Sequence, residues 1–91
     1  MAQTIWKVAL QVLDHQTVVL PAGAKFVHCG LQNDVVCLWY ATKMPVEQYT
    51  DRHIEMYGTG HTIPPGEDRA YLGTVLMRKD TFVLHVFERT S

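Results

Sequence analysis

The four residues Gly58-Thr59-Gly60-His61 carry the most suggestive chemistry in this chain. Glycines on both sides of Thr59 free the backbone to direct several N–H groups toward one point, which is the geometry of an anion-binding nest. Thr59 adds a hydroxyl, and His61 adds a hydrogen-bond donor or a stacking face. The segment lacks the Lys-Ser/Thr ending of a Walker loop. A tight turn at the end of a strand, with His61 on the surface, is the competing interpretation.

Aromatic and cationic side chains supply the other candidate ligand contacts. Trp6 stands beside Lys7 near the start of a strand-like segment, where an indole can stack on a nucleobase. Lys7 and Arg52 are candidates to neutralise a pyrophosphate, because both carry positive charge at neutral pH. The competing interpretation gives each cation a solvated salt bridge and each tryptophan a place in the core. The same alternatives apply to Trp39, Arg69 and Arg89.

Catalytic and metal-binding patterns are weak. His61 shares one flexible loop with Glu67 and Asp68, and His85 and Glu88 fall on opposite faces of a strand, so neither acid–base pair has a convincing geometry. The five histidines and two cysteines show no C-x-x-C or H-x-x-x-H spacing. We therefore expect no enzyme, metal or cofactor, with a small nucleotide hydrolase that uses His61 left open.

The elements that must position these residues are strands. Nearly every segment alternates apolar and polar residues or is a short β-branched run. This pattern predicts an all-β fold, a small antiparallel β-sandwich or open barrel of about seven strands, in a single domain over residues 1–91. A β-rich α+β fold is the alternative. The predicted strands are Thr4–Gln11, Thr17–Leu20 (ending at Pro21), Lys25–Leu31, Val35–Thr42, residues 51–57, Ala70–Met77 and Thr81–Arg89.

Two hairpins are predicted. A two-residue turn at Asn33-Asp34 places Cys29 opposite Leu38, whereas a three-residue loop would place it opposite Cys37 and allow a disulfide. Free, buried thiols are favoured because nothing marks the chain as secreted. The second hairpin turns around Lys79-Asp80 and places Met77, Val75 and Thr74 opposite Phe82, Leu84 and His85.

Residues Val46–Tyr57 are compatible with a helix of about three turns or with a strand. We favour a strand over residues 51–57, because Ile54 and Met56 alternate with His53 and Glu55. The next eleven residues, 58–68, contain three glycines and two prolines. A structured loop of this length in a small domain usually carries function.

Composition argues against several kinds of partner. Eight basic and nine acidic side chains give a net charge of -1 over 91 residues, which argues against a broad cationic surface for DNA or RNA and against a polybasic membrane anchor. No apolar run reaches the roughly 18 residues of a spanning helix, and the N-terminus lacks a cationic leader. A chain this short buries only about 60–65% of its extended surface, so we expect copies to associate into a homo-oligomer.

An ordered set of short motifs resembles a family of small proteins encoded mostly by tailed bacteriophages and prophages, a family of unknown function. The motifs cover almost the whole chain and are Ile5-Trp6-Lys7, Val18–Ala24 (VVLPAGA), Leu38-Trp39, Gly58–Pro64 (GTGHTIP), Tyr71-Leu72-Gly73-Thr74 and His85-Val86-Phe87-Glu88.

The resemblance implies a role by analogy. Small β-rich phage proteins of this kind are similar to proteins that sequester nucleotide-derived immune signals, such as cyclic ADP-ribose isomers or cyclic dinucleotides, in the host bacterial cytoplasm. Such proteins are typically homo-oligomers that hold the ligand at subunit interfaces. The expected ligand contacts are Trp6, Lys7, Arg52, Gly58, Thr59, Gly60 and His61.

One feature of the sequence argues against a ligand with many negative charges. The chain has no dense Arg/Lys cluster, so basic groups would have to gather from several copies. The alternative function is a protein-binding inhibitor or a phage assembly factor without a small-molecule ligand.

Overall fold

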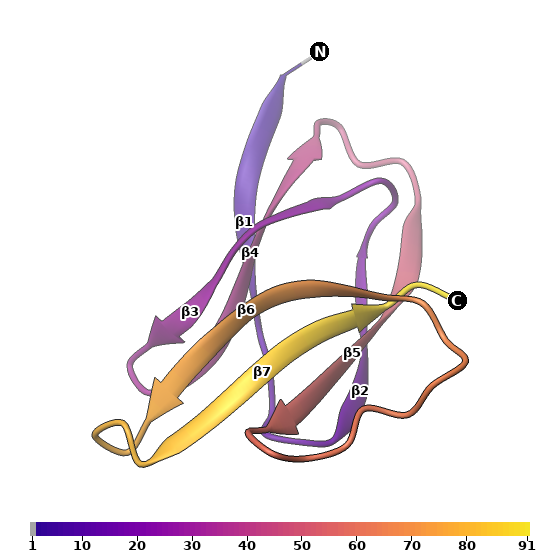
Figure 1. Ribbon diagram of the computed structural model, residues 1–91. Coiled ribbons are helices and arrows are strands. Elements are labelled where there is room, and N and C mark those ends of the chain that lie inside the picture. The colour runs from indigo at the N-terminus through magenta and orange to yellow at the C-terminus, as the bar shows by residue number, and fades with distance from the viewer. Residues whose placement is uncertain (1) are drawn as a thin grey trace.

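The computed structural model describes residues 2–91, and this range holds seven strands and no helix (Figure 1). The all-β fold class is therefore confirmed, and no helix that could span a membrane occurs in these residues. The strands are β1 (Gln3–Ala9), β2 (His15–Pro21), β3 (Lys25–Gln32), β4 (Val35–Lys43), β5 (Tyr49–Gly58), β6 (Arg69–Met77) and β7 (Phe82–Arg89).

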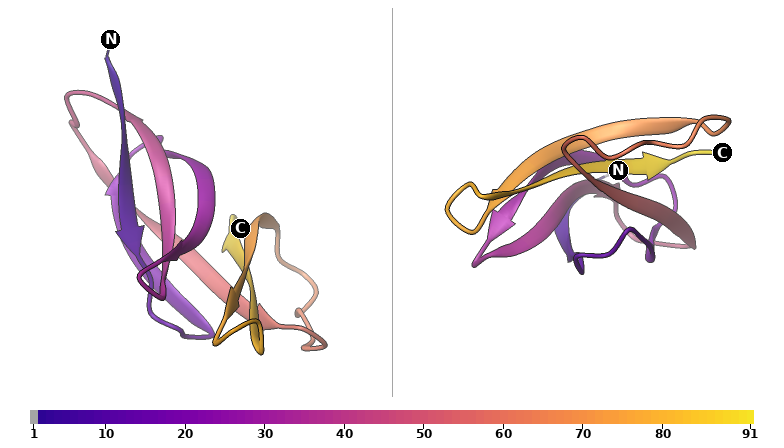
Figure 2. Two further views of the ribbon diagram at one scale, coloured as in Figure 1. Left: turned by 90° about the vertical axis from the view of Figure 1, so that its left-hand side faces the viewer. Right: turned by 60° about the horizontal axis from the view of Figure 1, so that its bottom comes forward.

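The strands form two antiparallel sheets. Sheet A has the order β1-β4-β3, and sheet B has the order β2-β5-β7-β6. The strands of the two sheets cross at an angle, and the β6–β7 hairpin forms one side of the molecule (Figures 1 and 2). The extents of 42 × 34 × 16 Å fit a body two sheets thick, because packed sheets lie about 10 Å apart.

The β3–β4 hairpin has the predicted two-residue turn. Asn33 and Asp34 both have positive φ (51° and 63°), as a type I′ turn requires, and Asn and Asp tolerate this conformation better than most residues. Cys29 lies opposite Leu38, so the register does not pair the two cysteines, and both thiols are free. Burial, followed by repulsion from Cys37, raises the pKa of the Cys29 thiol to about 11.

The ambiguous segment contributes a strand. β5 covers Tyr49–Gly58, so the strand interpretation is confirmed and the helical one is wrong. The alternation is masked at the centre of β5, where Ile54, Glu55 and Met56 are all buried although they point to alternate faces. β2 ends at Pro21, as predicted, and Pro21 still pairs with Tyr49; the strand begins at His15, two residues before the predicted start. β2 is an edge strand, where a missing N–H is tolerated.

The hydrophobic core lies between the inner faces of the two sheets. Most of its fully buried side chains come from β4 and from the central strands of sheet B, and they include Val36, Leu38, Ile54 and Val86. Trp6 also points to the inner side, opposite Tyr40, but it lies on the edge strand β1 and is 41% exposed. Its indole is therefore at the rim of the core.

Sheets A and B approach most closely where β3 meets β6. A Cβ on Gly73 would fall 2.8 Å from the Cβ of Cys29, well inside any normal contact. The pairing of β6 with β7 is irregular between Tyr71 and Gly73, which bends the strand there. A glycine at this position therefore lets the two sheets close on each other.

We predict that Gly73→Ala lowers the free energy of unfolding by roughly 1–3 kcal/mol, the usual cost of overpacking a core. Urea or thermal denaturation followed by circular dichroism measures the change. Leu76→Ala, on an exposed position of the same strand, is the matched control and should change stability by no more than about 0.5 kcal/mol. Equal stability of Gly73→Ala and the native chain would contradict the close approach.

Candidate functional site

Polar and aromatic side chains gather on the outer face of sheet B. Alternation along each strand and the pairing between strands place them there, since cross-strand partners share a face. The face therefore combines histidines, arginines, tyrosines and one buried carboxylate, side chains that can donate and accept hydrogen bonds. Its members include His15, Thr17, His53, Glu55, Tyr57, Arg69, Tyr71, Thr74, His85, Phe87 and Arg89.

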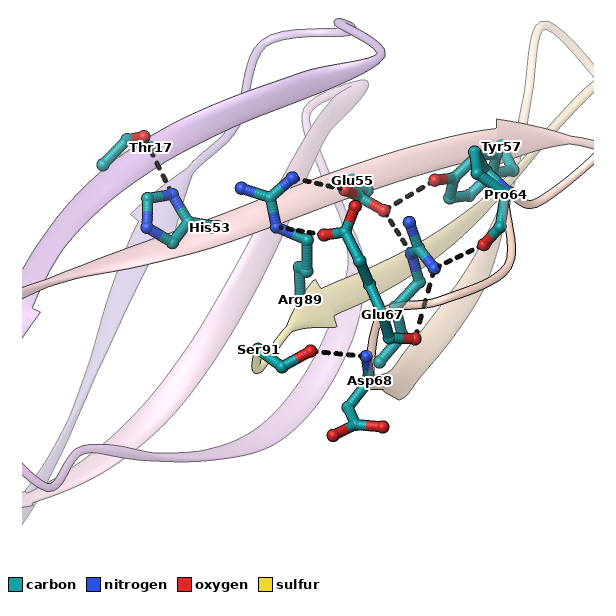
Figure 3. Close-up of polar contacts among 10 residues, drawn as sticks. Thr17, His53, Glu55, Tyr57, Pro64, Glu67, Asp68, Arg89 and Ser91 are labelled. Carbon is teal, nitrogen blue, oxygen red and sulfur yellow. Dashed lines mark hydrogen bonds and ion pairs between the residues drawn. The ribbon is translucent and has the colours of Figure 1, made fainter.

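The Glu55 carboxylate is at the centre of this face. Its side chain is only 7% exposed, and it accepts hydrogen bonds from Arg69 Nε at 2.6 Å and from the Tyr57 hydroxyl at 2.6 Å (Figure 3). Arg89 Nη1 lies 3.5 Å from its second oxygen. No buried side-chain N or O atom in residues 2–91 lacks a hydrogen-bond partner, so this charge is fully compensated.

The same cluster shifts the pKa values of its two acidic members, Glu55 and Tyr57. Burial by itself raises the pKa of Glu55, but the hydrogen bonds from Arg69 and Tyr57 and the charges of Arg69 and Arg89 outweigh burial, so the pKa lies below its ordinary value. Burial and then the bond to Glu55 raise the pKa of Tyr57. At neutral pH the carboxylate is therefore charged and the phenol is protonated.

The two arginines that hold Glu55 also hold the loop between β5 and β6. Arg69 Nη1 donates to the carbonyl oxygen of Pro64 at 2.8 Å, and Arg89 Nε lies 3.1 Å from the carboxylate of Glu67 (Figure 3). At the end of the loop, the Asp68 amide donates to the hydroxyl of Ser91 at 2.6 Å. The loop therefore lies across the outer face of sheet B, fastened to the Glu55 cluster.

A cleft of about 390 Å³ opens between this loop and the start of β2. Its volume is within the range of small-molecule sites. Asp14 and His15 line one side, His61, Thr62 and Pro64 line the other, and the floor is formed by β5 and Arg89. The wall therefore offers imidazole and pyrrolidine surfaces next to one arginine.

The Gly58–His61 segment forms a tight turn beside the cleft. The His61 amide donates to the Gly58 carbonyl at 3.1 Å, and Gly60 has a φ of 86°. The Thr59 hydroxyl bonds to Nε2 of His85 at 2.8 Å. The Thr59 hydroxyl, which was expected to face a ligand, is therefore used within the protein, as is the His61 amide, and the His61 ring is left exposed at the cleft.

The other predicted contacts lie elsewhere. Lys7 is on the outer face of sheet A, where its ammonium donates to Gln32 Oε1. Arg52 forms a two-pronged ion pair with Glu88, donates to the Ala24 carbonyl at 2.8 Å, and stands 4.7 Å from the centre of the Phe26 ring. Within one chain, Trp6, Lys7 and Arg52 do not meet the Gly58–His61 turn in one cleft.

The two acid–base pairs weighed from the sequence are not hydrogen-bonded. Glu67 is bound to Arg89, and His61 makes no side-chain hydrogen bond with any of the described residues. His85 bonds through its two ring nitrogens to Thr59 and Thr74, while Glu88 points to the inner face. Residues 2–91 also contain no group of three His, Cys, Asp or Glu side chains placed to hold a metal ion.

Sequence reasoning did not single out Glu55 and its role. One signal was present, because a glutamate between Ile54 and Met56 interrupts the apolar centre of a strand. A charge at such a position must find a partner when it is buried. Which arginines serve as partners depends on the pairing of β5, β7 and β6, which the sequence pattern does not specify.

The fold and the cleft define the class: a small all-β protein of two antiparallel sheets with a ligand-sized cleft on one outer face. The chain belongs to a family described as a domain of unknown function (DUF7352), whose model matches residues 1–91. No curated protein and no solved structure matches it.

We predict that Glu55→Gln lowers stability most at neutral pH. The lowered pKa of Glu55 means that its carboxylate stabilises the fold above the unfolded-state pKa of about 4.3, and that this contribution disappears as the pH falls through the folded-state value. Urea unfolding from pH 7 to pH 3 should therefore show the gap between the native chain and Glu55→Gln narrowing toward acid. A gap that is constant or widens toward pH 3 would contradict the cluster.

Proposed function

We propose that this is a phage-encoded, non-enzymatic binding protein that sequesters a nucleotide-derived immune signal in the cytoplasm of an infected bacterium. The ligand class is cyclic ADP-ribose isomers or cyclic dinucleotides. The observation that carries the proposal is the cleft beneath the 59–68 loop, with the exposed imidazole of His61 at its wall and Arg89 at its floor. The resemblance of the chain to small phage proteins supports the biological context.

The cleft residues have suitable chemistry for a base and a phosphate. His61 and His15 present flat faces and ring nitrogens to the cleft. Arg89 uses Nε and Nη1 toward Glu67 and Glu55 and is 31% exposed, so its remaining N–H donors can meet a phosphate oxygen. Because Arg89 is already paired with two carboxylates, its attraction for a phosphate is limited. We therefore expect the cleft to hold one phosphate group of the ligand.

Self-association is part of the proposal. The folded chain exposes 5987 Å², compared with roughly 5,400 Å² for an average monomer of this mass. The excess includes large apolar side chains on the edge strands of sheet B, such as Val19 on β2 and Tyr71 on β6. A second copy would cover this surface and add its own cations to a ligand held between subunits. A protein partner on the same residues is the alternative function.

We predict that His61→Ala and Arg89→Gln each weaken ligand binding at least tenfold in isothermal titration calorimetry against a panel of ADP-ribose isomers and cyclic dinucleotides. Arg78→Gln, which removes a cation from the distant β6–β7 loop, is the matched control and should bind normally. Heat denaturation of the complex should release the ligand intact. No heat with any panel member, or recovery of ligand fragments, would contradict sequestration.

A further inference from the structure

Charge is divided unevenly between the two sheets. The strands of sheet A contain three lysines, Lys7, Lys25 and Lys43, and no acidic residue. The rest of the chain then holds five basic and nine acidic side chains. The net charge of -1 therefore conceals a sheet with three positive charges attached to a body with an excess of four negative ones.

All three lysines lie on the outer face of sheet A, the face turned away from the core. Strand pairing arranges this face in rows across the sheet: Gln3 beside Lys43, then Ile5, Ala41 and Lys25, then Lys7, Trp39 and His28. Successive rows are about 6.8 Å apart, because a strand rises about 3.4 Å per residue. None of the three lysines forms an ion pair with the residues that the structure describes.

Trp39 stands in the middle of the row that Lys7 and His28 complete. Its ring centroid lies 5.5 Å from that of His28, with an angle of 48° between the planes. Its neighbours along β4 on the same face are Cys37 and Ala41, both small. A partly buried indole among small residues and beside an exposed imidazole leaves part of its aromatic surface open to solvent.

Two contacts fix the positions of His28 and Lys7 on this face. The His28 ring occupies space that a side chain at position 30 would fill, since a Cβ on Gly30 would fall 2.8 Å from His28 Nε2. The Lys7 ammonium reaches Gln32 on the far strand β3, so its chain crosses over β4, where Cys37 is only 2% exposed. Gln32 is neutral, so this hydrogen bond leaves the charge of Lys7 uncompensated.

From this arrangement we propose that the outer face of sheet A is a binding surface for a short single-stranded nucleic acid. A base stacks on Trp39, and phosphates lie along the rows marked by Lys43, Lys25 and Lys7. Aromatic side chains next to cations on an open sheet are the combination that binds single strands without sequence preference. The proposal is independent of the cleft on sheet B and goes beyond the proposed function.

Charge complementarity favours this occupant over a second copy of the chain. Two copies facing each other through sheet A would bring six lysines together without a carboxylate on either set of strands. Like charges in close contact oppose association. An anionic strand is attracted by the same residues.

The test is the fluorescence anisotropy of a labelled eight-nucleotide oligothymidylate titrated with the protein at several salt concentrations. Three phosphate contacts on a single strand predict that log K falls with log salt concentration with a slope of about −2. Lys7→Gln, Lys25→Gln and Lys43→Gln should each weaken binding and reduce the slope by about 0.7. In a Trp6→Phe background, the oligonucleotide should quench the fluorescence of Trp39.

Trp39→Leu should weaken binding at least about fivefold, the lower end of the stacking contribution per base. Lys79→Gln, in the β6–β7 loop, is the matched control, and both it and His61→Ala should bind the oligonucleotide normally. The lysine variants keep the test decisive if Trp39→Leu fails to fold. The proposal is overturned by absence of binding at low salt, by equal effects of Lys79→Gln and the sheet A lysines, or by sedimentation showing that Lys7→Gln dissociates an oligomer.

Discussion

The arrangement of the outer face of sheet B depends on one interaction, the pairing of the buried Glu55 carboxylate with two arginines and a tyrosine. Glu55 lies on the central strand β5 with almost no solvent contact, and a carboxylate in that position destabilises the fold unless cations and hydrogen-bond donors surround it. Arg69, Tyr57 and Arg89 meet that requirement. Both arginines also bind the 59–68 loop, so the compensation of Glu55 determines where the loop lies, and the loop in turn forms one wall of the cleft.

The two sheets therefore differ in what covers them. Sheet B has the core on one face and the Glu55 cluster with its loop on the other, so its cations are paired within the chain. Sheet A has the core on one face only, and its three lysines have no acidic partner in the described residues. The same fold thus presents a cleft beside paired charges on one side and an aromatic surface with unpaired positive charge on the other.

Local chemistry made much of the fold predictable. The Asn33-Asp34 turn and the resulting opposition of Cys29 and Leu38 follow from residues that tolerate positive φ. The site was less predictable, because it depends on pairing between distant strands. For Arg52 the sequence offered a phosphate contact or a salt bridge, and its partner Glu88, 36 residues away in sequence, is identified only by the pairing of β5 with β7. The helical alternative for Val46–Tyr57 remained open because this strand is buried on both faces at its centre. A strand of this kind does not show the clear alternation of apolar and polar residues that distinguishes it from a helix.

The Glu55 cluster fastens the 59–68 loop over sheet B through Arg69 and Arg89. Backbone ¹⁵N order parameters measured by NMR relaxation test this claim most directly, residue by residue. In the native chain the loop should be nearly as rigid as the strands, at about 0.85, and in Glu55→Gln it should fall below about 0.6 while β3 and β4 stay unchanged. A loop that is already below about 0.6 in the native chain, or that stays rigid without the carboxylate, would contradict it.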